Sequence, residues 1–363
     1  MKITLLSTGL QVGGAEKQVC SLADYYASNG NEVQLISITG DSVIKPNNSK
    51  IEIVELKSKK SLLGLARSYV EARARIKKFS PDVVHSHMVH ANIFARLLRL
   101  SVNIPKLICT AHSSNEGGLA RMFAYRLTDR LCDLTTNVGE EAKRISISRG
   151  AVPAHRIMAM YNGINTKCFM YSHHARDKRR RELGISQDDV LLLAVGRLTA
   201  AKDYPNLLSA FSIVSNIKEN TRLIIIGSGE EEKTLKVLTD SLGISSKVDF
   251  LGLRHDVNEW MCAADLYVMS SAWEGIPLVL LEAMSCELMV VATDCGGVKE
   301  ILNGFGYLSP PQNSQILADS ILAGLSLDVE EKQKKIKLAR DYVEKKFSLS
   351  SIASRWLDIY KLQ

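Results

Sequence analysis

Residues 266–297 read LYVMSSAWEGIPLVLLEAMSCELMVVATDCGG, and this stretch decides the fold class that the whole chain predicts. Two short apolar runs, Leu266–Met269 and Met289–Ala292, flank a longer apolar segment near Pro277. Because proline lacks an N–H group and suits the first turn of a helix, we expect a helix to begin near Pro277. A strand, a helix and a second strand in this order predict a parallel sheet that helices cover on both faces.

Glu274 and Glu282 are placed around the start of this helix. We expect Glu274 in the loop before the helix and Glu282 on the helix, with unpaired N–H groups between them forming an anion site. This layout fits a ligand with hydroxyl groups at both ends and phosphate in the middle, as in a nucleotide-sugar. A glutamate near a helix N-terminus can also stabilise the helix alone, by roughly 0.3–1 kcal/mol. The apolar neighbours Leu278–Leu281 favour the ligand, because burying an unsatisfied carboxylate among them is costly.

The composition predicts a folded, soluble chain of two domains. The chain has 363 residues, of which 46% are hydrophobic and 8 are proline, too long for one ordinary core. Its seven cysteines contain no Cys-x-x-Cys pair, so we expect reduced thiols in the cytoplasm, with no disulfide framework and no zinc site. The N-terminus has no signal-peptide pattern. Charges and Pro277 interrupt the apolar stretch Ile276–Cys295, so we expect no transmembrane helix.

Short apolar runs alternate with helical patterns from end to end, which predicts two doubly wound α/β domains. The expected strands of the first sheet are Ile3–Ser7, Val33–Ile38, Val83–His85, Lys106–Thr110 and Leu134–Asn137, and those of the second are Leu191–Val195, Leu223–Ile226, Val248–Phe250, Leu266–Met269 and Met289–Ala292. We expect the first domain at 1–165, completed by a returning amphipathic helix at 348–363, and the second domain at 166–347. The charged run Arg176–Glu182 predicts a solvated helix start.

The net charge of +7 is unevenly distributed. Between residues 57 and 106 many lysines and arginines occur with only Glu71 and Asp82 as acids, and apolar residues form a stripe in the same segment. A basic amphipathic helix of this kind can contact anionic lipid, and a solvated helix face is the equally weighted alternative. Nucleic acid is the weaker alternative, because few aromatic residues lie between the charges.

Further candidate residues follow the expected strands, where open parallel sheets bind their ligands. Gly13 and Gly14 open a helix after the first strand and let a ligand approach its backbone. His112 is a candidate to hydrogen-bond a sugar hydroxyl or a forming phosphate charge, whereas a metal site at His85 and His87 lacks further ligands. The remaining candidates lie in the second domain: Arg197 and Lys202 as a clamp for a diphosphate, and Gly227 at the end of the next strand.

These motifs, taken together, resemble family 4 of the retaining glycosyltransferases. The matching motifs are Gly13-Gly14-Ala15-Glu16, Asn162-Gly163-Ile164, Gly196-Arg197-Leu198 with Lys202, Gly227-Ser228-Gly229, Glu274-x7-Glu282 and Gly296-Gly297-x-x-Glu300. The resemblance spans nearly the whole chain and is most specific between Ser270 and Glu300. It implies the GT-B architecture, in which two Rossmann-like domains face a deep cleft and a last helix crosses back.

The resemblance also implies roles for individual residues. Glu282 would bind the ribose hydroxyls of the donor nucleotide, and Glu274 would bind hydroxyls of the transferred sugar. Arg197 and Lys202 would stabilise the leaving diphosphate, where negative charge develops. The remaining implied contacts to the donor are the backbone of Gly275, Ile276 and Leu278, the side chain of His112, which would face the sugar, and Gly227. Gly14 would lie beside the phosphates or the acceptor. No cofactor and no metal ion are expected, because the cations do the work of a metal.

The implied reaction is sugar transfer with retention of the anomeric configuration, by front-face attack in which the leaving phosphate takes the proton of the acceptor. A covalent route through a carboxylate is the rival. The donor is expected to be a UDP- or GDP-sugar. The Gly-Gly-Ala-Glu-Lys start resembles bacterial enzymes that extend polyprenyl-diphosphate-linked glycans for O-antigen or capsule, which suggests a cytoplasmic protein at the inner face of the membrane.

Two other functions remain open from the sequence. A UDP-sugar 2-epimerase has the same architecture and transfers no sugar. A non-catalytic protein could keep a nucleotide fold and dock on a membrane, although it need not keep both cations and both glutamates. A dehydrogenase is less favoured, because the Gly-x-Gly-x-x-Gly fingerprint of nicotinamide-binding domains is missing.

Overall fold

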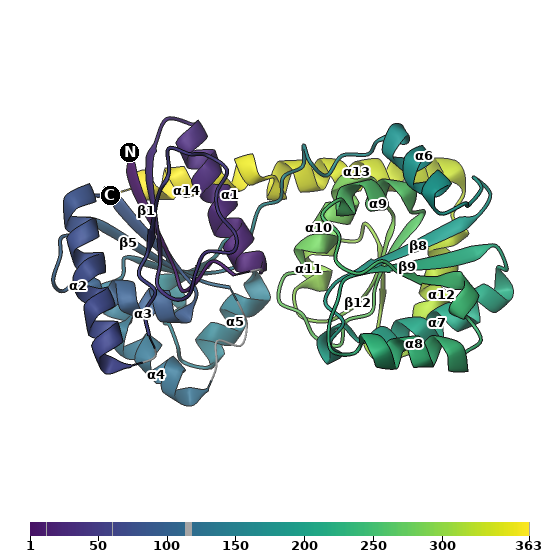
Figure 1. Ribbon diagram of the computed structural model, residues 1–363, viewed down its shortest axis with the longest axis horizontal. Helices are drawn as coiled ribbons and strands as arrows, with labels where there is room; N and C mark the ends of the chain where they lie inside the picture. Colours follow the sequence, from purple (N-terminus) through teal and green to yellow (C-terminus); the bar gives the residue numbers. More distant parts are fainter. Residues whose placement is uncertain (12, 60, 113–117, 363) are drawn as a thin grey trace. The chain divides into compact units, whose positions relative to one another are not determined.

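The computed structural model describes residues 1–11, 13–59, 61–112 and 118–362. It divides into two compact units, each with its own sheet and helices (Figure 1). Unit 1 comprises Met1–Gly163 and Leu349–Gln363, and unit 2 comprises Ile164–Ser348. Each unit is a parallel sheet with helices on both faces, the doubly wound α/β class that the sequence predicts.

Unit 1 contains a seven-stranded parallel sheet in the order β3-β2-β1-β4-β5-β6-β7. Its strands are β1 Lys2–Ser7, β2 Glu32–Ser37, β3 Glu52–Glu55, β4 Val83–His87, β5 Lys106–Ala111, β6 Leu134–Asn137 and β7 Ile157–Ala159. Its α-helices are α1 Gly14–Ser28, α2 Leu62–Phe79, α3 Val89–Leu98, α4 Leu119–Thr128, α5 Glu140–Ser148 and α14 Leu349–Lys361. The buried strand residues pack against α1 and α14 on one face and against α2 and α3 on the other.

Unit 2 contains a six-stranded parallel sheet in the order β10-β9-β8-β11-β12-β13. Its strands are β8 Val190–Val195, β9 Thr221–Ile226, β10 Val248–Phe250, β11 Leu266–Met269, β12 Val290–Thr293 and β13 Tyr307–Ser309. Its α-helices are α6 His173–Glu182, α7 Tyr204–Ile217, α8 Glu232–Ser241, α9 Val257–Ala263, α10 Leu278–Ser285, α11 Val298–Leu302, α12 Ser314–Leu325 and α13 Val329–Phe347. The core between β8, β11 and helices α7 and α12 is fully buried.

The expected strands are all present, within one or two residues at their ends, whereas β3, β7 and β13 were not predicted. All three are edge strands of three or four residues. A short edge strand needs no continuous apolar run, because one side of it has no neighbouring strand and its faces are less covered. The strongest apolar runs therefore predict the centre of each sheet, and β10 is the one edge strand among the described elements that they also predict.

Helix α14 belongs to unit 1 although it lies at the end of the chain. Its residues Ile352, Trp356 and Tyr360 are buried, and it packs along α1, as Figure 1 shows by the yellow helix beside the purple one. The Tyr360 hydroxyl lies 3.3 Å from the hydroxyl of Tyr26 on α1. The last helix therefore completes the core of the first sheet.

The charged run Arg176–Glu182 is the point at which a prediction from the sequence was wrong. It forms helix α6, but Arg179 and Arg180 on it are only 7% and 1% exposed. Arg180 donates to the carbonyl of Ala263 at the end of α9 and to Asp265. The last carbonyls of a helix lack intrahelical donors, and the five N–H groups of an arginine can satisfy several of them. These arginines therefore hold α6 against α9 instead of facing solvent.

Two further observations concern the cysteines and membrane spans. All seven cysteines lie in the described part of the chain and are free, and only Cys168 is exposed. Within the residues that the structure describes, no helix combines the length and the apolar character needed to cross a membrane.

Candidate functional site

Each sheet has one point at which the order of its strands reverses direction. In unit 2, successive strands run outward from β8 on one side and from β11 on the other, and in unit 1 they run outward from β1 and from β4. Open α/β sheets bind ligands outside the carboxyl ends of the strands at this point. The candidate residues Arg197 and Glu274 follow β8 and β11, and Gly14 follows β1. Topology therefore predicts a ligand site in each unit, and the candidate residues lie there.

In unit 2, Glu274, Lys202 and Ser271 form a compact cluster. The Lys202 ammonium and the Glu274 carboxylate form an ion pair through Oε1, with 22% and 12% of the two side chains exposed. The Ser271 hydroxyl donates to the same oxygen at 2.6 Å. Glu274 Oε2 has no partner among the described residues. One carboxylate oxygen is thus held by the protein, and the other remains able to accept from a ligand hydroxyl.

Helix α10 begins at Leu278, with Pro277 as its N-cap residue instead of its first helical residue. Within the described part of the chain, the N–H groups of Gly275, Ile276 and Leu278 have no hydrogen-bond acceptor. Such groups at a helix start attract anions. Glu282 lies on the second turn of α10 and is partly exposed. The order that the sequence predicts, with a glutamate in the loop and a glutamate on the helix, is confirmed.

The loop that carries Glu274 rests on the glycine turn after β12. Gly296 has a φ angle of +54°, and a Cβ atom there would come within 2.2 Å of the Glu274 carbonyl oxygen. The Gly297 N–H group donates to the carbonyl of Gly275 at 2.9 Å. The glycine pair thus permits a backbone contact that fixes the position of Glu274.

Arg197 and Gly227 lie after neighbouring strands. Arg197 follows β8, is exposed, and forms no hydrogen bond through its guanidinium with any described residue. Gly227 follows β9 with a φ angle of +144°, and a Cβ atom there would come within 1.9 Å of the Gly196 carbonyl oxygen. Glycine is therefore required at position 227 by the fold itself, because the loop after β9 packs there against the backbone that carries Arg197. The structure places both residues as expected, but only Arg197 offers a side chain to a ligand.

In unit 1, three histidines lie on two adjacent strands. His85 and His87 share one face of β4, because alternate residues of a strand point the same way. The His87 Nδ1 atom lies 3.0 Å from His112 Nε2, directly after β5. His85 is bonded on both ring nitrogens, to the Tyr360 hydroxyl and to the Thr110 hydroxyl, at 2.6 Å each. Helix α14 thus supports this cluster through Tyr360.

Burial lowers the pKa of all three histidines, that of His112 to about 4 and those of His85 and His87 well below the ordinary 6.5. The three rings are therefore neutral at neutral pH. A neutral imidazole has one N–H donor and one acceptor nitrogen. His112 thus offers a polar but uncharged group, which suits a hydroxyl better than a phosphate.

Gly14 is the first residue of α1, and a Cβ atom placed on it would meet nothing within 4 Å. The protein itself therefore does not require glycine at this position. Gly275 in unit 2 is likewise surrounded by open space. Open space at a helix start is what a close approach of ligand to backbone needs.

The sequence did not identify Ser271, His87 or Tyr360 as partners of the candidate residues. For His87 a signal existed, because its spacing from His85 places both on one strand face. Ser271 is three residues from Glu274 in a loop, where no periodicity predicts a contact. Within the described residues no group of three or more His, Cys, Asp or Glu side chains is placed to hold a metal ion.

Two models of known families match this chain in succession. Residues 12–167 match "Glycosyltransferase Family 4", and residues 175–341 match "Glycosyl transferases group 1". Together they cover nearly the whole chain. The chain belongs to family 4 of the glycosyltransferases. It is a glycosyltransferase of GT-B architecture, as the sequence motifs imply.

Relatives and solved structures agree with this assignment. An uncharacterized glycosyltransferase of Methanocaldococcus jannaschii is 27% identical, covering 97% of this chain and 95% of the relative. UDP-Gal:alpha-D-GlcNAc-diphosphoundecaprenol alpha-1,3-galactosyltransferase of Escherichia coli is 27% identical, covering 68% of this chain and 67% of the relative. The crystal structure of Anabaena HepE in complex with UDP superposes with a TM-score of 0.86 at 23% identity, covering 99% of each chain. The last of these likenesses concerns the fold alone.

Proposed function

We propose that this glycosyltransferase moves a sugar from a UDP-sugar to a lipid-linked glycan, with retention of the anomeric configuration. The observation that carries the proposal is the cluster after β8 and β11, where Lys202, Glu274 and the start of α10 meet at the switch point of the sheet. The UDP in the complex of HepE and the UDP-galactose donor in the name of the E. coli relative support UDP as the nucleotide. Because family members transfer sugars, we do not propose an epimerase or a non-catalytic protein.

The cluster supplies the charges that departure of a nucleoside diphosphate needs. A lysine ammonium has three N–H donors, so Lys202 can bind Glu274 and still donate to phosphate oxygens. Arg197 adds a planar cation without a protein partner among the described residues. Glu274 Oε2 accepts from a hydroxyl of the transferred sugar, the N–H groups of Gly275, Ile276 and Leu278 face the phosphates, and Glu282 accepts from the ribose hydroxyls.

The chemistry is a front-face substitution at the anomeric carbon. The acceptor oxygen forms a bond to that carbon while the bond from the carbon to the diphosphate oxygen breaks, and the released phosphate oxygen takes the proton of the acceptor. Lys202 and Arg197 stabilise the negative charge as it develops. Lys202 and Ser271 hold Glu274 Oε1 and leave Oε2 for a ligand hydroxyl. Because the role implied for Glu274 places it at the edge of the transferred sugar, we assign this carboxylate to positioning the sugar and not to attack on its carbon.

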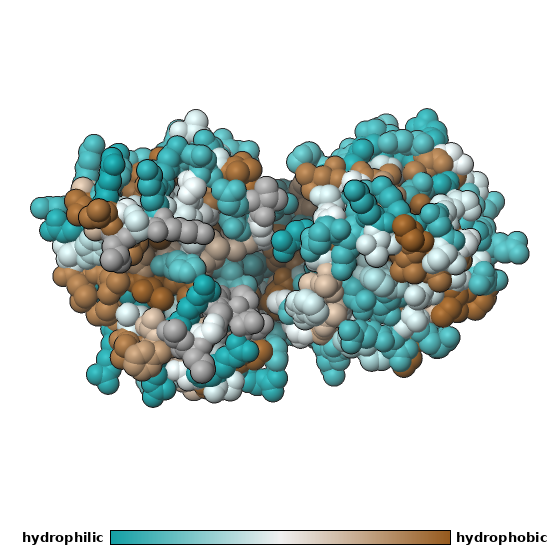
Figure 2. Space-filling model, turned by 60° about the horizontal axis from the view of Figure 1, so that its bottom comes forward, coloured by the Kyte–Doolittle hydropathy of each residue, from teal (hydrophilic) through white to brown (hydrophobic). Residues whose placement is uncertain are grey.

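The acceptor is a polyprenyl-diphosphate-linked oligosaccharide, as in O-antigen or capsule synthesis, and the protein works in the cytoplasm at the membrane surface. The name of the E. coli relative, which acts on a diphosphoundecaprenol-linked sugar, supports this acceptor. Exposed apolar side chains on unit 1 support contact with lipid: Leu63, Leu65 and Val70 on α2, Leu97 and Leu100 at the end of α3, and Phe123 and Leu127 on α4. Figure 2 shows apolar side chains gathered on this body among polar ones.

The basic residues of the segment 57–106 differ in whether the protein itself supplies their partners. Arg96 is fully buried beside Asp129, and Lys106 donates to the Ile359 carbonyl of α14, so these residues stabilise the fold. Lys59, Arg67, Lys77 and Lys78 are exposed and have no partner among the described residues, while Lys60 lies outside the described residues. The exposed group, on and before α2, is the part that would meet anionic lipid.

Donor hydrolysis tests the proposal without an acceptor. Release of UDP or GDP from a panel of nucleotide-sugars would be measured for the native chain, Glu274→Ala, Arg197→Ala and the matched surface variant Lys337→Ala, which removes an exposed cation of α13. We expect slow release from one donor, which Lys337→Ala retains and the other two variants lose. If no donor is hydrolysed or bound, the roles given to the cluster are wrong.

A further inference from the structure

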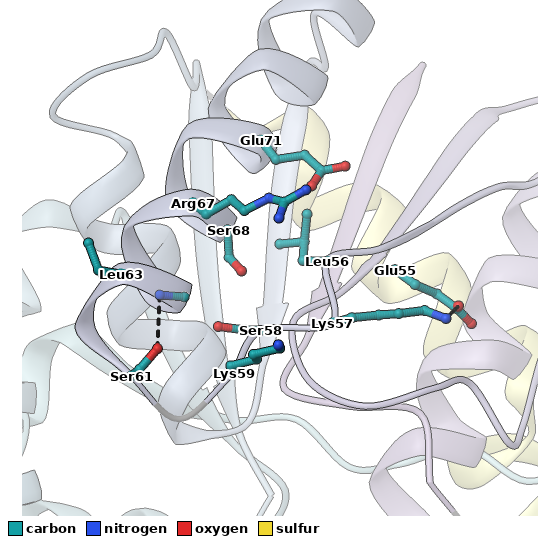
Figure 3. Close-up of a pocket in the computed structure, with 11 residues that line it drawn as sticks. Glu55, Leu56, Lys57, Ser58, Lys59, Ser61, Leu63, Arg67, Ser68 and Glu71 are labelled. Carbon is teal, nitrogen blue, oxygen red and sulfur yellow. Dashed lines mark hydrogen bonds and ion pairs between the residues drawn. The ribbon is translucent and has the colours of Figure 1, made fainter.

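A pocket lies in unit 1, away from the strand-order reversal. It has a volume of about 560 Å³ and lies between the loop that follows β3 and the first turns of helix α2. Figure 3 shows its walls, with Lys57, Ser58 and Lys59 on the loop and Ser61, Arg67 and Ser68 on the helix side. The pocket opens at the carboxyl end of β3, the edge of the sheet at which ligands bind in this class of fold.

The charges around this pocket do not cancel. Lys57 is paired with Glu55 and Asp41 at 3.5 and 2.6 Å, and Glu71 is paired with Arg75 at 3.7 Å. The carboxylates that line the pocket therefore already have cationic partners. Lys59 and Arg67 have no ion pair or hydrogen bond with any described residue. The wall itself carries three cations (Lys57, Lys59 and Arg67) and two carboxylates (Glu55 and Glu71), so its net charge is 3 − 2 = +1, and two of the cations have no ion pair with a described residue.

Ser68 provides an independent sign of a ligand. It is 2% exposed, and its hydroxyl forms no hydrogen bond with any residue that the structure describes. Figure 3 shows the hydroxyl pointing from α2 toward the loop of Ser58 and Lys59, into the pocket. The Ser68 hydroxyl oxygen is not one of the fully enclosed polar atoms of the described residues, so it faces the open space of the pocket, where water or a ligand can bond to it. A ligand oxygen in the pocket would supply the missing partner.

The N-terminus of α2 also attracts an anion to this pocket. Ser61 is the N-cap residue and accepts from the Gly64 N–H group at 3.1 Å, so the capping hydroxyl is occupied. The preceding N–H groups of the first turn have no acceptor within the helix and form the positive end of its dipole. The pocket therefore combines backbone N–H groups, two unpaired cations and a free hydroxyl. This set of groups is complementary to a phosphate and poor at binding a neutral sugar.

The surface beside the pocket is apolar. Leu63 on the first turn is 85% exposed, and Val70 two turns later is 65% exposed. An anion with an attached hydrocarbon chain would place its phosphates in the pocket and its chain along these side chains. A free phosphate would leave them in water.

We propose that this pocket binds the diphosphate group of a prenyl-diphosphate-linked acceptor and is a subsite separate from the donor cluster. The proposal rests on the lipid-linked acceptor of the proposed function. Lys59 and Arg67 neutralise the diphosphate, and the Ser68 hydroxyl donates to one of its oxygens. Strands in a sheet are about 4.8 Å apart, so a phosphate at β3 lies about 14 Å, or three strand spacings, from the carboxyl end of β4. The glycan attached to that phosphate can span this distance to His87 and His112.

Binding of a soluble probe tests the pocket without any activity. Calorimetry with geranyl diphosphate would use the full chain carrying Arg197→Ala in every sample, so that the donor cluster loses a phosphate ligand. The double variant Lys59→Gln with Arg67→Gln loses its charge-assisted hydrogen bonds to the diphosphate, so we expect its Kd for geranyl diphosphate to rise about ten-fold or more. The matched control Lys77→Gln with Lys78→Gln removes the same charge from the other end of α2 and should leave the Kd unchanged. Equal effects of both pairs would overturn the proposal.

Ser68→Ala separates binding from folding. Replacing a buried hydroxyl that has no partner does not destabilise a protein, so the melting temperature should stay the same while the Kd for geranyl diphosphate rises. An unchanged Kd would remove Ser68 from the site. If inorganic diphosphate binds as tightly as geranyl diphosphate, the apolar surface plays no part and the assignment to a lipid is wrong.

Two further measurements distinguish the remaining outcomes. If the Lys59 and Arg67 variants lose binding to phosphatidylglycerol vesicles but still bind geranyl diphosphate, the pocket binds phospholipid headgroups and the proposal is wrong. In transfer assays they should raise the KM for a prenyl-diphosphate-linked acceptor about ten-fold and leave donor hydrolysis unchanged. Absence of donor hydrolysis in the native chain would contradict the proposed function, whereas normal hydrolysis with an unchanged acceptor KM would contradict only the pocket.

Discussion

The two points of strand-order reversal, one in each unit, have the same topology, but charged side chains line the one in unit 2 and uncharged residues line the one in unit 1. The one in unit 2 is lined by an arginine, an ion pair of Lys202 with Glu274, and a helix start with open N–H groups. The one in unit 1 is lined by glycine and by histidines that burial keeps neutral. Topology thus determines where a ligand lies, and the side chains determine which kind of ligand. Unit 2 suits a group whose charge changes during a reaction, and unit 1 suits hydroxyl groups.

The largest expected effect tests the charged reversal. Lys202→Met should lower kcat for donor hydrolysis about 10²–10³-fold, because a cation aimed at the leaving group is lost. Lys202→Met combined with Glu274→Gln forms a double-mutant cycle with the two single variants, measured by steady-state kinetics. If Lys202 only holds Glu274 in place, the double variant will be no slower than Glu274→Gln alone, and the role of Lys202 as a phosphate ligand would be wrong.

Acid should destabilise unit 1 through its neutral histidines. The folded pKa of His112 is lowered from 6.5 to about 4, so the unfolded chain binds this proton first, and stability is lost as the pH falls from 6.5 toward 4. His112 alone should reduce the free energy of unfolding by about 3 kcal/mol at pH 4, and His85 and His87 act in the same direction.

The measurement is urea unfolding between pH 7 and pH 4, followed by the fluorescence of Trp356, which contacts His85 at a ring distance of 4.4 Å. Trp260→Phe with Trp273→Phe removes the other two tryptophans of the chain, both in unit 2, so that the signal reports unit 1. A stability of unit 1 that does not change between pH 7 and pH 4 would contradict the neutral state of the cluster.

His87 should act through His112 as a positioning residue. His87→Ala removes the group 3.0 Å from His112 Nε2 and should lower kcat/KM about ten-fold, as loss of a hydrogen bond that orients a substrate ligand. His87→Asn places a polar nitrogen near the same position and should restore part of the activity. If Ala and Asn behave alike while both fold normally, the contact has no part in positioning.

The smallest expected effect concerns Gly14. Gly14→Ala meets no protein atom within 4 Å, and alanine favours a helix over glycine by up to about 1 kcal/mol, less at the first helical position. The melting temperature should therefore stay the same or rise, while the KM for substrate increases if the ligand approaches the backbone here. Gly184→Ala is a useful contrast, since a Cβ atom there also meets nothing but the φ angle of +63° strains any other residue. An unchanged KM for Gly14→Ala would show that the ligand lies elsewhere.

The sequence predicted the central parts of both sheets but few of the contacts. Apolar runs such as Leu191–Val195 are local signals, because a strand covered on both faces must be apolar throughout. Glu274 and Lys202 were each recognisable from their motifs, whereas their ion pair joins residues 72 positions apart. Arg179 and Arg180 show the reverse case. A run of charge predicts exposure to solvent, whereas Arg180 donates to the Ala263 carbonyl at the end of α9 and Arg179 pairs with the Asp256 carboxylate, so both side chains are buried.

By itself the sequence determined the fold class, the family, and which charged and glycine residues follow the strands. Hydrophobic periodicity, turn residues and short motifs are properties of residues that are neighbours in the chain, so they can be recognised without the structure. Only the tertiary structure decided which of these residues meet. It joined Lys202 to Glu274, packed the neutral histidines against a helix from the far end of the chain, and left Lys59, Arg67 and Ser68 around one pocket without partners among the described residues. Pairing and burial depend on segments that are remote in sequence, and only the packed chain brings those segments together.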